Sequence, residues 1–177
     1  MRAVIRALIQ TPLGPINFYS THLSGDSDLL NLKQTRELVA FIDKYRADGP
    51  AVLVGDFNFS GKTAGSRYLA EVGYVDTFRA ANPGRDNATC CTCIAKGYHN
   101  WFDTCRDQPF IGSDDRVYLI PGRIFHGEVL ESNFMLGSRF PYAGKSLWAS
   151  DHKGIESQIR LLSLPVNLEP ASLGGSP

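Results

Sequence analysis

Four short polar clusters in this sequence carry residue types suited to acid–base and metal chemistry. Each lies beside an apolar run that predicts a strand, so each is expected at a strand end. In chain order they are Ser20-Thr21-His22, Gly55-Asp56-Phe57-Asn58, Ser113-Asp114-Asp115-Arg116 and Ser150-Asp151-His152. Histidines, carboxylates and an asparagine can supply a base, hydrogen-bond donors and oxygen ligands for a divalent metal. Splitting a phosphoester requires these groups.

Each cluster taken alone also has a structural interpretation. A Gly-Asp-x-Asn turn is commonly a strand exit, and a single histidine such as His22 commonly lies hydrogen-bonded at a strand end. Ser-Asp-His commonly forms a helix cap or a turn, and an Asp-Arg pair commonly forms a surface ion pair. The occurrence of all four clusters in one chain favours the chemical interpretation.

Composition places the chain among compact globular proteins. The chain has 177 residues, of which 43% are hydrophobic and 20% charged, enough for one domain with a sizeable core. Eighteen basic residues balance eighteen acidic ones, so net charge does not indicate a nucleic-acid or membrane-surface protein. No apolar run is long enough to predict a membrane span, and residues 1–6 lack the order of a signal peptide.

Periodicity predicts a layered α/β domain with mainly antiparallel sheets. Strands are expected at 2–10, 16–23, 51–54, 116–120, 123–130 and 154–162. Helices are expected at about 33–47 and 64–72, the second ended by Gly73. Residues 82–112 read as a long surface excursion. We expect one domain over 1–163 and an unstructured tail over 164–177, which is dense in Pro, Gly and Ser.

The order of the motifs resembles the endonuclease/exonuclease/phosphatase superfamily. The matching order is Thr-His-Leu, a helix, Val-Gly-Asp-Phe-Asn, Asp-Arg at a strand start, and Ser-Asp-His, and it runs from about residue 5 to residue 162. This superfamily includes deoxyribonuclease I, exonuclease III-like repair enzymes, neutral sphingomyelinases and inositol polyphosphate 5-phosphatases. The resemblance implies a four-layer α-β-β-α sandwich of the deoxyribonuclease I-like type. It also implies a metal-dependent phosphoester hydrolase.

The resemblance assigns a role to each motif that carries a histidine. His152 would activate the attacking water or stabilise the phosphate. Asp115 would orient His152, because a carboxylate that accepts from one imidazole nitrogen makes the other more basic. Asp114 is the alternative partner, and Asp115 is preferred because it directly precedes the strand. His22 would donate a hydrogen bond or a proton on the phosphate or leaving-group side.

The remaining roles concern the phosphate and a metal. Asp56 and Asn58 would lie under the scissile phosphate, with Asn58 donating to a phosphoryl oxygen. Asp56 would position the nucleophile or ligate a metal, and Asp151 would be a metal ligand directly or through water. Their hard oxygen donors favour Mg²⁺ or Mn²⁺.

The sequence departs from the family pattern before His22. Family members carry an asparagine on a first strand and a later Gln-Glu pair whose glutamate is the principal metal ligand, and neither precedes His22 here. We therefore expect an N-terminally truncated domain, either a fragment of an active enzyme or a shortened member. The alternative function is a non-catalytic protein that binds a phosphorylated ligand or partner without turnover.

The cysteines gather in one stretch. Cys90, Cys91, Cys93 and Cys105 lie near His99, which leaves a zinc site open, but a disulfide-clipped loop is the favoured interpretation. Disulfides imply an oxidising compartment, so the expected location is extracellular. The substrate is not indicated beyond a phosphoester: nucleic acid, a phospholipid head group and an inositol phosphate all fit. The sequence does not indicate an oligomeric state.

Overall fold

The computed structural model describes residues 2–46, 49–59, 62–90, 112–122 and 125–163. The predicted tail at 164–177 and most of the excursion lie outside them. The strands are β1 (Val4–Thr11), β2 (Gly14–His22), β3 (Ala51–Asp56), β4 (Val75–Asp76), β5 (Asp115–Ile120), β6 (Phe125–Met135), β7 (Arg139–Tyr142), β8 (Lys145–Trp148) and β9 (Gly154–Ser163). The helices are α1 (Asp28–Arg46), α2 (Ala64–Glu71) and α3 (Thr77–Ala81).

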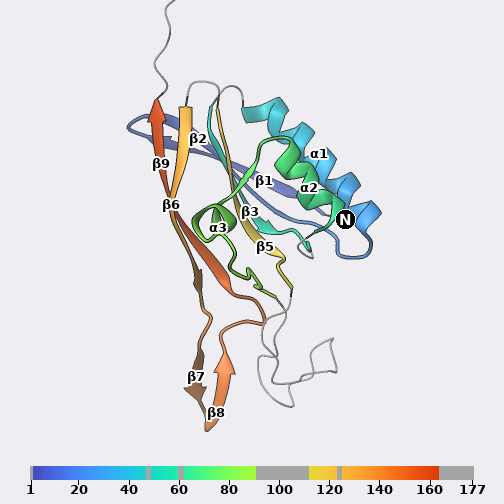
Figure 1. Ribbon diagram of the computed structural model, residues 1–177, viewed down its shortest axis with the longest axis vertical. Helices are drawn as coiled ribbons and strands as arrows, with labels where there is room; N and C mark the ends of the chain where they lie inside the picture. The colour runs from blue at the N-terminus through green and yellow to red at the C-terminus, as the bar shows by residue number, and fades with distance from the viewer. Residues whose placement is uncertain (1, 47–48, 60–61, 91–111, 123–124, 164–177) are drawn as a thin grey trace, which may run out of the picture.

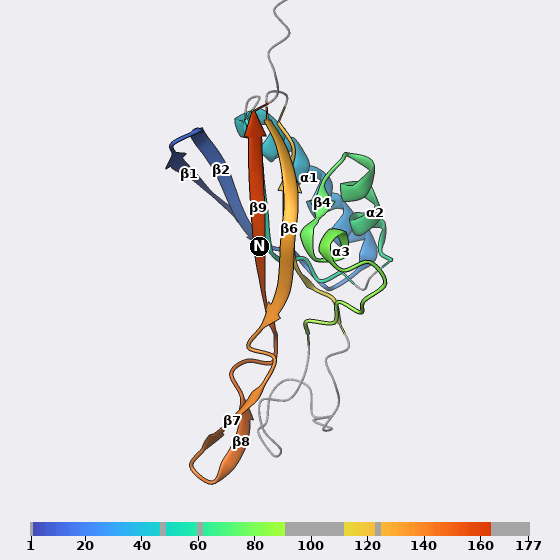
Figure 2. The ribbon, with the colours of Figure 1, turned by 60° about the vertical axis from the view of Figure 1, so that its left-hand side comes forward.

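A five-stranded sheet forms the centre of the molecule, in the order β1-β2-β3-β5-β4 (Figure 1). Strands β2 and β3 run parallel, and every other neighbouring pair in this sheet is antiparallel. Strands β6 and β9 pair as a second, two-stranded sheet, and β7 and β8 form a hairpin that projects from it (Figure 2). The prediction of mainly antiparallel pairing is confirmed.

Helices α1 and α2 cover one face of the five-stranded sheet (Figures 1 and 2). Alternate residues of the strands point into this layer because side chains of a strand alternate between its faces. The buried cluster joins both helices to three strands and includes Tyr19, Leu38, Ile42, Leu53, Leu69 and Tyr118. Within the cluster the Phe57 and Tyr118 rings meet edge to face, with centroids 5.2 Å apart. This layer is the main core of the described residues.

The β6–β9 pair lies on the other side of the central sheet and contacts β5. Gly127 of β6 lies so close to Leu119 that an added Cβ would come within 2.5 Å of its side chain. Helix α3 contacts β5, β6 and β9, and Thr77 hydrogen-bonds Ser157 across this junction at 2.8 Å. The mixed α/β class is confirmed. The described residues supply three layers, helix, sheet and sheet, so the fourth layer stays a prediction.

Several elements differ from their predicted bounds. Helix α1 begins at Asp28 rather than near 33, with Ser27 Oγ accepting from Leu30 N. Leu29 in its first turn is 79% exposed. The pattern of buried apolar residues that predicts a helix therefore begins after the first turn. Helix α3, absent from the prediction, has five residues, too few for a periodic signal, and is capped by Asp76. In the β7–β8 turn, also not predicted, Ala143 adopts a positive φ of 47°.

Gly55 is the backbone position on which the site most directly depends. It has φ of +146°, and a Cβ there would lie 1.9 Å from the carbonyl oxygen of Thr21 on β2. Only glycine allows the ends of β2 and β3 to approach this closely, directly beside His22 and Asp56.

Gly55→Ala should therefore destabilise the domain by about 4 kcal/mol or more, because both the clash and the backbone strain oppose folding. Gly73→Ala is the matched control: Gly73 has φ of +84° but nothing within 4 Å of an added Cβ, so only strain, about 1–2 kcal/mol, is expected. Urea unfolding of both variants measures the difference, and equal losses would contradict this account.

Candidate active site

Three strand ends lie in register and bring three of the predicted residues together. His22 at the end of β2 pairs with Asp56 at the end of β3, and Asp56 pairs with Asp115 at the start of β5. Two backbone bonds beyond the strands continue this alignment: Leu23 N donates to Asp56 O at 2.9 Å and Phe57 N donates to Asp114 O at 2.7 Å. The residues therefore lie side by side at one end of the central sheet.

His152 reaches this group from the segment that precedes β9. Its Nδ1 lies 2.7 Å from Asp115 Oδ2, and the two side chains are 28% and 24% exposed. His152 N also donates to Ser150 Oγ at 3.1 Å, which ties the histidine into its own turn. The partner of His152 in the structure is Asp115, not Asp114. Because Nδ1 faces the carboxylate, Nε2 is the nitrogen left for chemistry.

Two groups in this site, His152 and Asp114, have pKa values above their ordinary values. The hydrogen bond that His152 Nδ1 donates to the Asp115 carboxylate raises the pKa of His152 to about 9, against an opposing effect of burial. Burial raises the pKa of Asp114 to about 6, and the negative charges of Asp56 and Asp115 add to that shift. At neutral pH the site therefore holds an imidazolium at His152, together with a carboxyl group, Asp114, that titrates only slightly below neutrality.

Asp56 and Asn58 follow the end of β3 in a tight turn. Asp56 Oδ1 accepts from Asn58 N at 2.9 Å, and Asp56 Oδ2 lies 3.4 Å from His22 Nε2. Asn58 adopts a positive φ of 51°, which asparagine tolerates better than most residues. Its side-chain Nδ2 donates to Leu23 O at 2.9 Å, so one of its two N–H groups holds the neighbouring loop and one remains. His22 is the most open member, at 53% exposure.

Two carboxylates and a histidine at this site are candidate ligands for a metal ion. Asp56, Asp115 and His152 each place one candidate ligand atom within 4.8 Å of the others. The oxygen donors fit a hard divalent cation. Asp151, the other predicted ligand, is not part of this group; its Oδ1 accepts from Ser150 Oγ at 3.3 Å.

Two residues at the site, Arg116 and Thr89, received no role in the prediction from sequence. Arg116 is buried, and it donates to Asp76 Oδ2 at 2.7 Å and to Ser113 Oγ at 2.9 Å rather than forming a surface ion pair with its aspartate neighbours. Thr89 is fully buried, and its Oγ1 accepts from Asp115 N at 3.0 Å. The Arg116–Asp76 and Thr89–Asp115 contacts join residues 40 and 26 positions apart, so no local pattern reveals them.

Of the four cysteines, only Cys90 lies in the described part of the chain. It is 2% exposed and is not a free thiol. Cys91, Cys93 and Cys105 fall outside the described residues, as does His99, so the disulfide-clipped loop and its alternative stay predictions.

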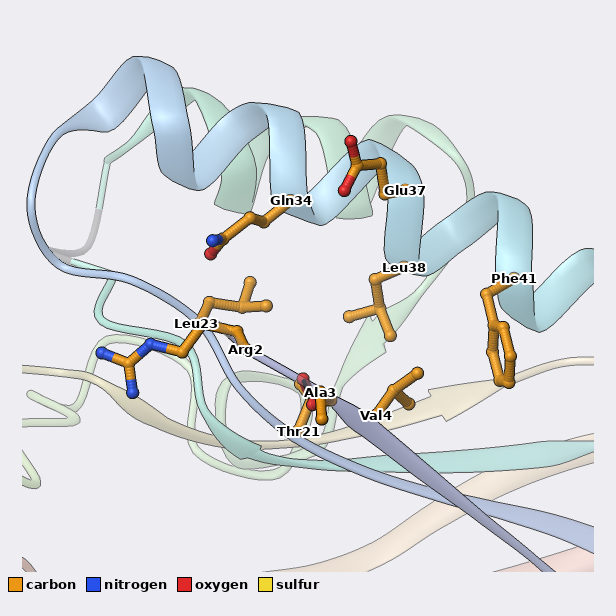
Figure 3. Close-up of a pocket in the computed structure, with 9 residues that line it drawn as sticks. All are labelled: Arg2, Ala3, Val4, Thr21, Leu23, Gln34, Glu37, Leu38 and Phe41. Atoms are coloured by element: carbon orange, nitrogen blue, oxygen red, sulfur yellow. Dashed lines mark hydrogen bonds between the residues drawn. The ribbon is translucent and has the colours of Figure 1, made fainter.

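A surface pocket beside β1 lies apart from the predicted site residues. It measures about 370 Å³ and lies between α1 and the beginning of β1 (Figure 3). Gln34, Glu37, Leu38 and Phe41 of α1 face Val4 and the segment before it across this cavity. Thr21 and Leu23, which flank His22, also line it.

Among the described helices, none is long and apolar enough to span a membrane.

The sheet order and the motifs at its strand ends define a domain with the endonuclease/exonuclease/phosphatase fold, as predicted. An endonuclease/exonuclease/phosphatase from Beutenbergia cavernae matches over 90% of this chain with 24% identity and a TM-score of 0.58. One from Bacteroides vulgatus matches over 91% with 17% identity and a TM-score of 0.64. TDP2 from D. rerio, solved with a single-strand DNA product, matches over 90% with 16% identity and a TM-score of 0.65.

The present chain spans only part of these proteins: 39%, 56% and 62% of their lengths, respectively. At these identities the likeness shows the fold alone. No protein-family model and no curated protein matches the sequence.

The raised pKa of His152 predicts how stability depends on pH. A histidine whose pKa is about 9 when folded and 6.5 when unfolded stabilises the domain fully below pH 6.5, and this contribution disappears as pH rises through 9. Between pH 6 and pH 9.5 the unfolding free energy should fall by about 1–3 kcal/mol more in the unsubstituted protein than in His152→Gln. Urea unfolding at both pH values measures this, and parallel pH profiles would refute the shift.

Proposed function

We propose that this domain belongs to a metal-dependent phosphoester hydrolase. The observation that carries the proposal is the His152–Asp115 pair beside Asp56, with His22 on the opposite side of Asp56. A phosphoester substrate brings negative charge that grows on its oxygens in the transition state. The site offers a cationic imidazolium, a second histidine and a carboxylate within one small region, which is the complement that such a substrate needs.

Each residue has a definite task in this proposal. Asp115 fixes the tautomer of His152 and leaves Nε2 directed at the substrate, where it holds or transfers a proton on a phosphoryl oxygen or on the attacking water. His22 is exposed and borders Asp56, so it donates to the phosphate or to the leaving group. The remaining N–H of Asn58 contributes a further hydrogen bond to the phosphate.

A divalent cation, Mg²⁺ or Mn²⁺, would be held by Asp56, the predicted ligand that lies in the candidate metal group. Asp151, which lies outside that group, stays a sequence-based expectation as a second ligand. When bound, it would neutralise charge on the phosphoryl group and make a bound water more acidic. Asp56 Oδ1 is oriented by Asn58 N, so its carboxylate is already positioned before any ligand arrives.

The exposure of the site side chains indicates which class of phosphoester to test first. His22, Asp56 and His152 lie at a sheet end, and part of each side chain is exposed. An open site of this kind suits a large phosphodiester, and TDP2, one of the solved structures with this fold, was captured with a DNA product. Nucleic acid is therefore the first substrate to test, followed by a phospholipid head group and an inositol phosphate.

The proposal predicts turnover that depends on both the metal and the histidine pair. A generic phosphodiester, bis-p-nitrophenyl phosphate, is assayed with Mg²⁺, with Mn²⁺ and with EDTA, using this chain and any longer product of the same reading frame. His152→Ala should lower kcat by about 10²–10⁴-fold because it removes the acid–base group, and EDTA should abolish turnover. Asp43→Asn, an exposed carboxylate on α1, is the control and should leave turnover unchanged.

Two outcomes would overturn this function. One is metal-dependent turnover that survives His152→Ala, since the proposed site would then not be the active site. The other is the absence of turnover from every product of the reading frame. Retention of phosphate binding in that second case, measured by calorimetry, would support the non-catalytic alternative instead.

A further inference from the structure

Among the strands of the described residues, the backbone of Asp115 has one neighbour, β3. On one side β3 pairs with β5 along its whole length, from Asp56↔Asp115 onward. On the other side β4 is two residues long and pairs only with Leu119 and Tyr118. The N–H of Asp115 points away from β3 and lies beyond the end of β4. A buried N–H needs an acceptor, because leaving it unpaired costs the full desolvation of the group.

Thr89 supplies that acceptor. Its Oγ1 lies 3.0 Å from Asp115 N, and the residue is fully buried, so water does not replace the hydroxyl. The role differs from that of Thr35, an equally buried threonine, whose hydroxyl donates at 2.8 Å to Asn31 O within its own helix. The Thr89 hydroxyl instead bonds the backbone of a residue 26 positions away.

The backbone of Thr89 bonds the segments that carry both members of the pair. Its N–H donates to Gly112 O at 2.6 Å, three residues before Asp115, and its carbonyl accepts from Lys153 N at 2.7 Å, directly after His152. The next residue, Cys90, forms isolated bridges with Gly112 and with His152. One short stretch of chain thus lies between the two segments and bonds each of them.

We infer that Thr89 is the positioning residue of the His152–Asp115 pair. Its hydroxyl holds the start of β5, and its carbonyl holds the turn that carries His152, so together they set the 2.7 Å contact between the two side chains. This inference rests on the proposed function for its catalytic meaning, but its structural content can be measured without turnover. Thr89 touches neither a substrate nor a metal in this account; it acts through Asp115 and His152.

The test compares Thr89→Val, which keeps the shape and removes the hydroxyl, with Thr89→Ser, which keeps the hydroxyl. Thr35→Val is the control for loss of a buried threonine hydroxyl elsewhere. Proton NMR follows the hydrogen-bonded imidazole N–H of His152, and hydrogen exchange follows the amide of Asp115. In Thr89→Val the imidazole signal should be lost or move upfield, and the Asp115 amide should exchange about tenfold faster or more. Thr89→Ser and Thr35→Val should keep both signals.

Turnover provides the second measurement. If the domain hydrolyses bis-p-nitrophenyl phosphate, Thr89→Val should lower kcat by about 10–100-fold with little change in KM, and Thr89→Ser should restore it. Thr89→Ala, which inserts no methyl against Asp115, replaces the valine variant if that one does not fold.

The outcomes separate this inference from the proposed function. An unchanged imidazole signal and unchanged Asp115 exchange in the hydroxyl-free variants would overturn the inference. Equal losses in Thr35→Val would also overturn it, because the effect would then be general destabilisation. Loss of the signal only in the hydroxyl-free Thr89 variants supports the inference even if no protein turns over substrate, and in that case the proposed function alone fails.

Discussion

The hydrogen bond between His152 and Asp115 is the interaction on which the rest of the site depends. It joins the segment before β9 to the first residue of β5, two parts of the chain that belong to different sheets. It also sets the charge of the site, since this bond is the main reason that the pKa of His152 rises to about 9. The imidazolium of His152 is held in place by Asp115, so it is already oriented before an anionic ligand binds.

The sheet register provides the other half of the site. His22, Asp56 and Asp115 occupy neighbouring positions because β2, β3 and β5 end or begin at the same level. A shift of one residue in any of these strands would turn its side chain to the opposite face. Gly55 allows the strands to approach at this level, and the buried core beneath them, from Tyr19 to Leu53 and Tyr118, keeps the register.

Charge at the site is balanced at short range. Three carboxylates, those of Asp56, Asp114 and Asp115, lie near one another, and their repulsion is part of what raises the pKa of Asp114 to about 6. His152 and Arg116 oppose that repulsion. Arg116 is itself buried against Asp76, and an arginine that loses water at this depth needs such a partner. Two cations, His152 and Arg116, therefore lie close enough to the acidic cluster to offset its repulsion.

The sequence by itself determined the main strands, two of the three described helices and the polar groups at the strand ends. Apolar runs such as 51–54 predict strands because alternation and β-branching are local properties, and Val-Gly-Asp-Phe-Asn and Ser-Asp-His are recognised from neighbouring letters. Only the tertiary structure decided which groups meet. Asp115 rather than Asp114 faces His152, and Thr89 accepts the hydrogen bond of Asp115 N, which lies beyond the end of β4. Pairings between residues tens of positions apart depend on register and chain path, which no local pattern encodes.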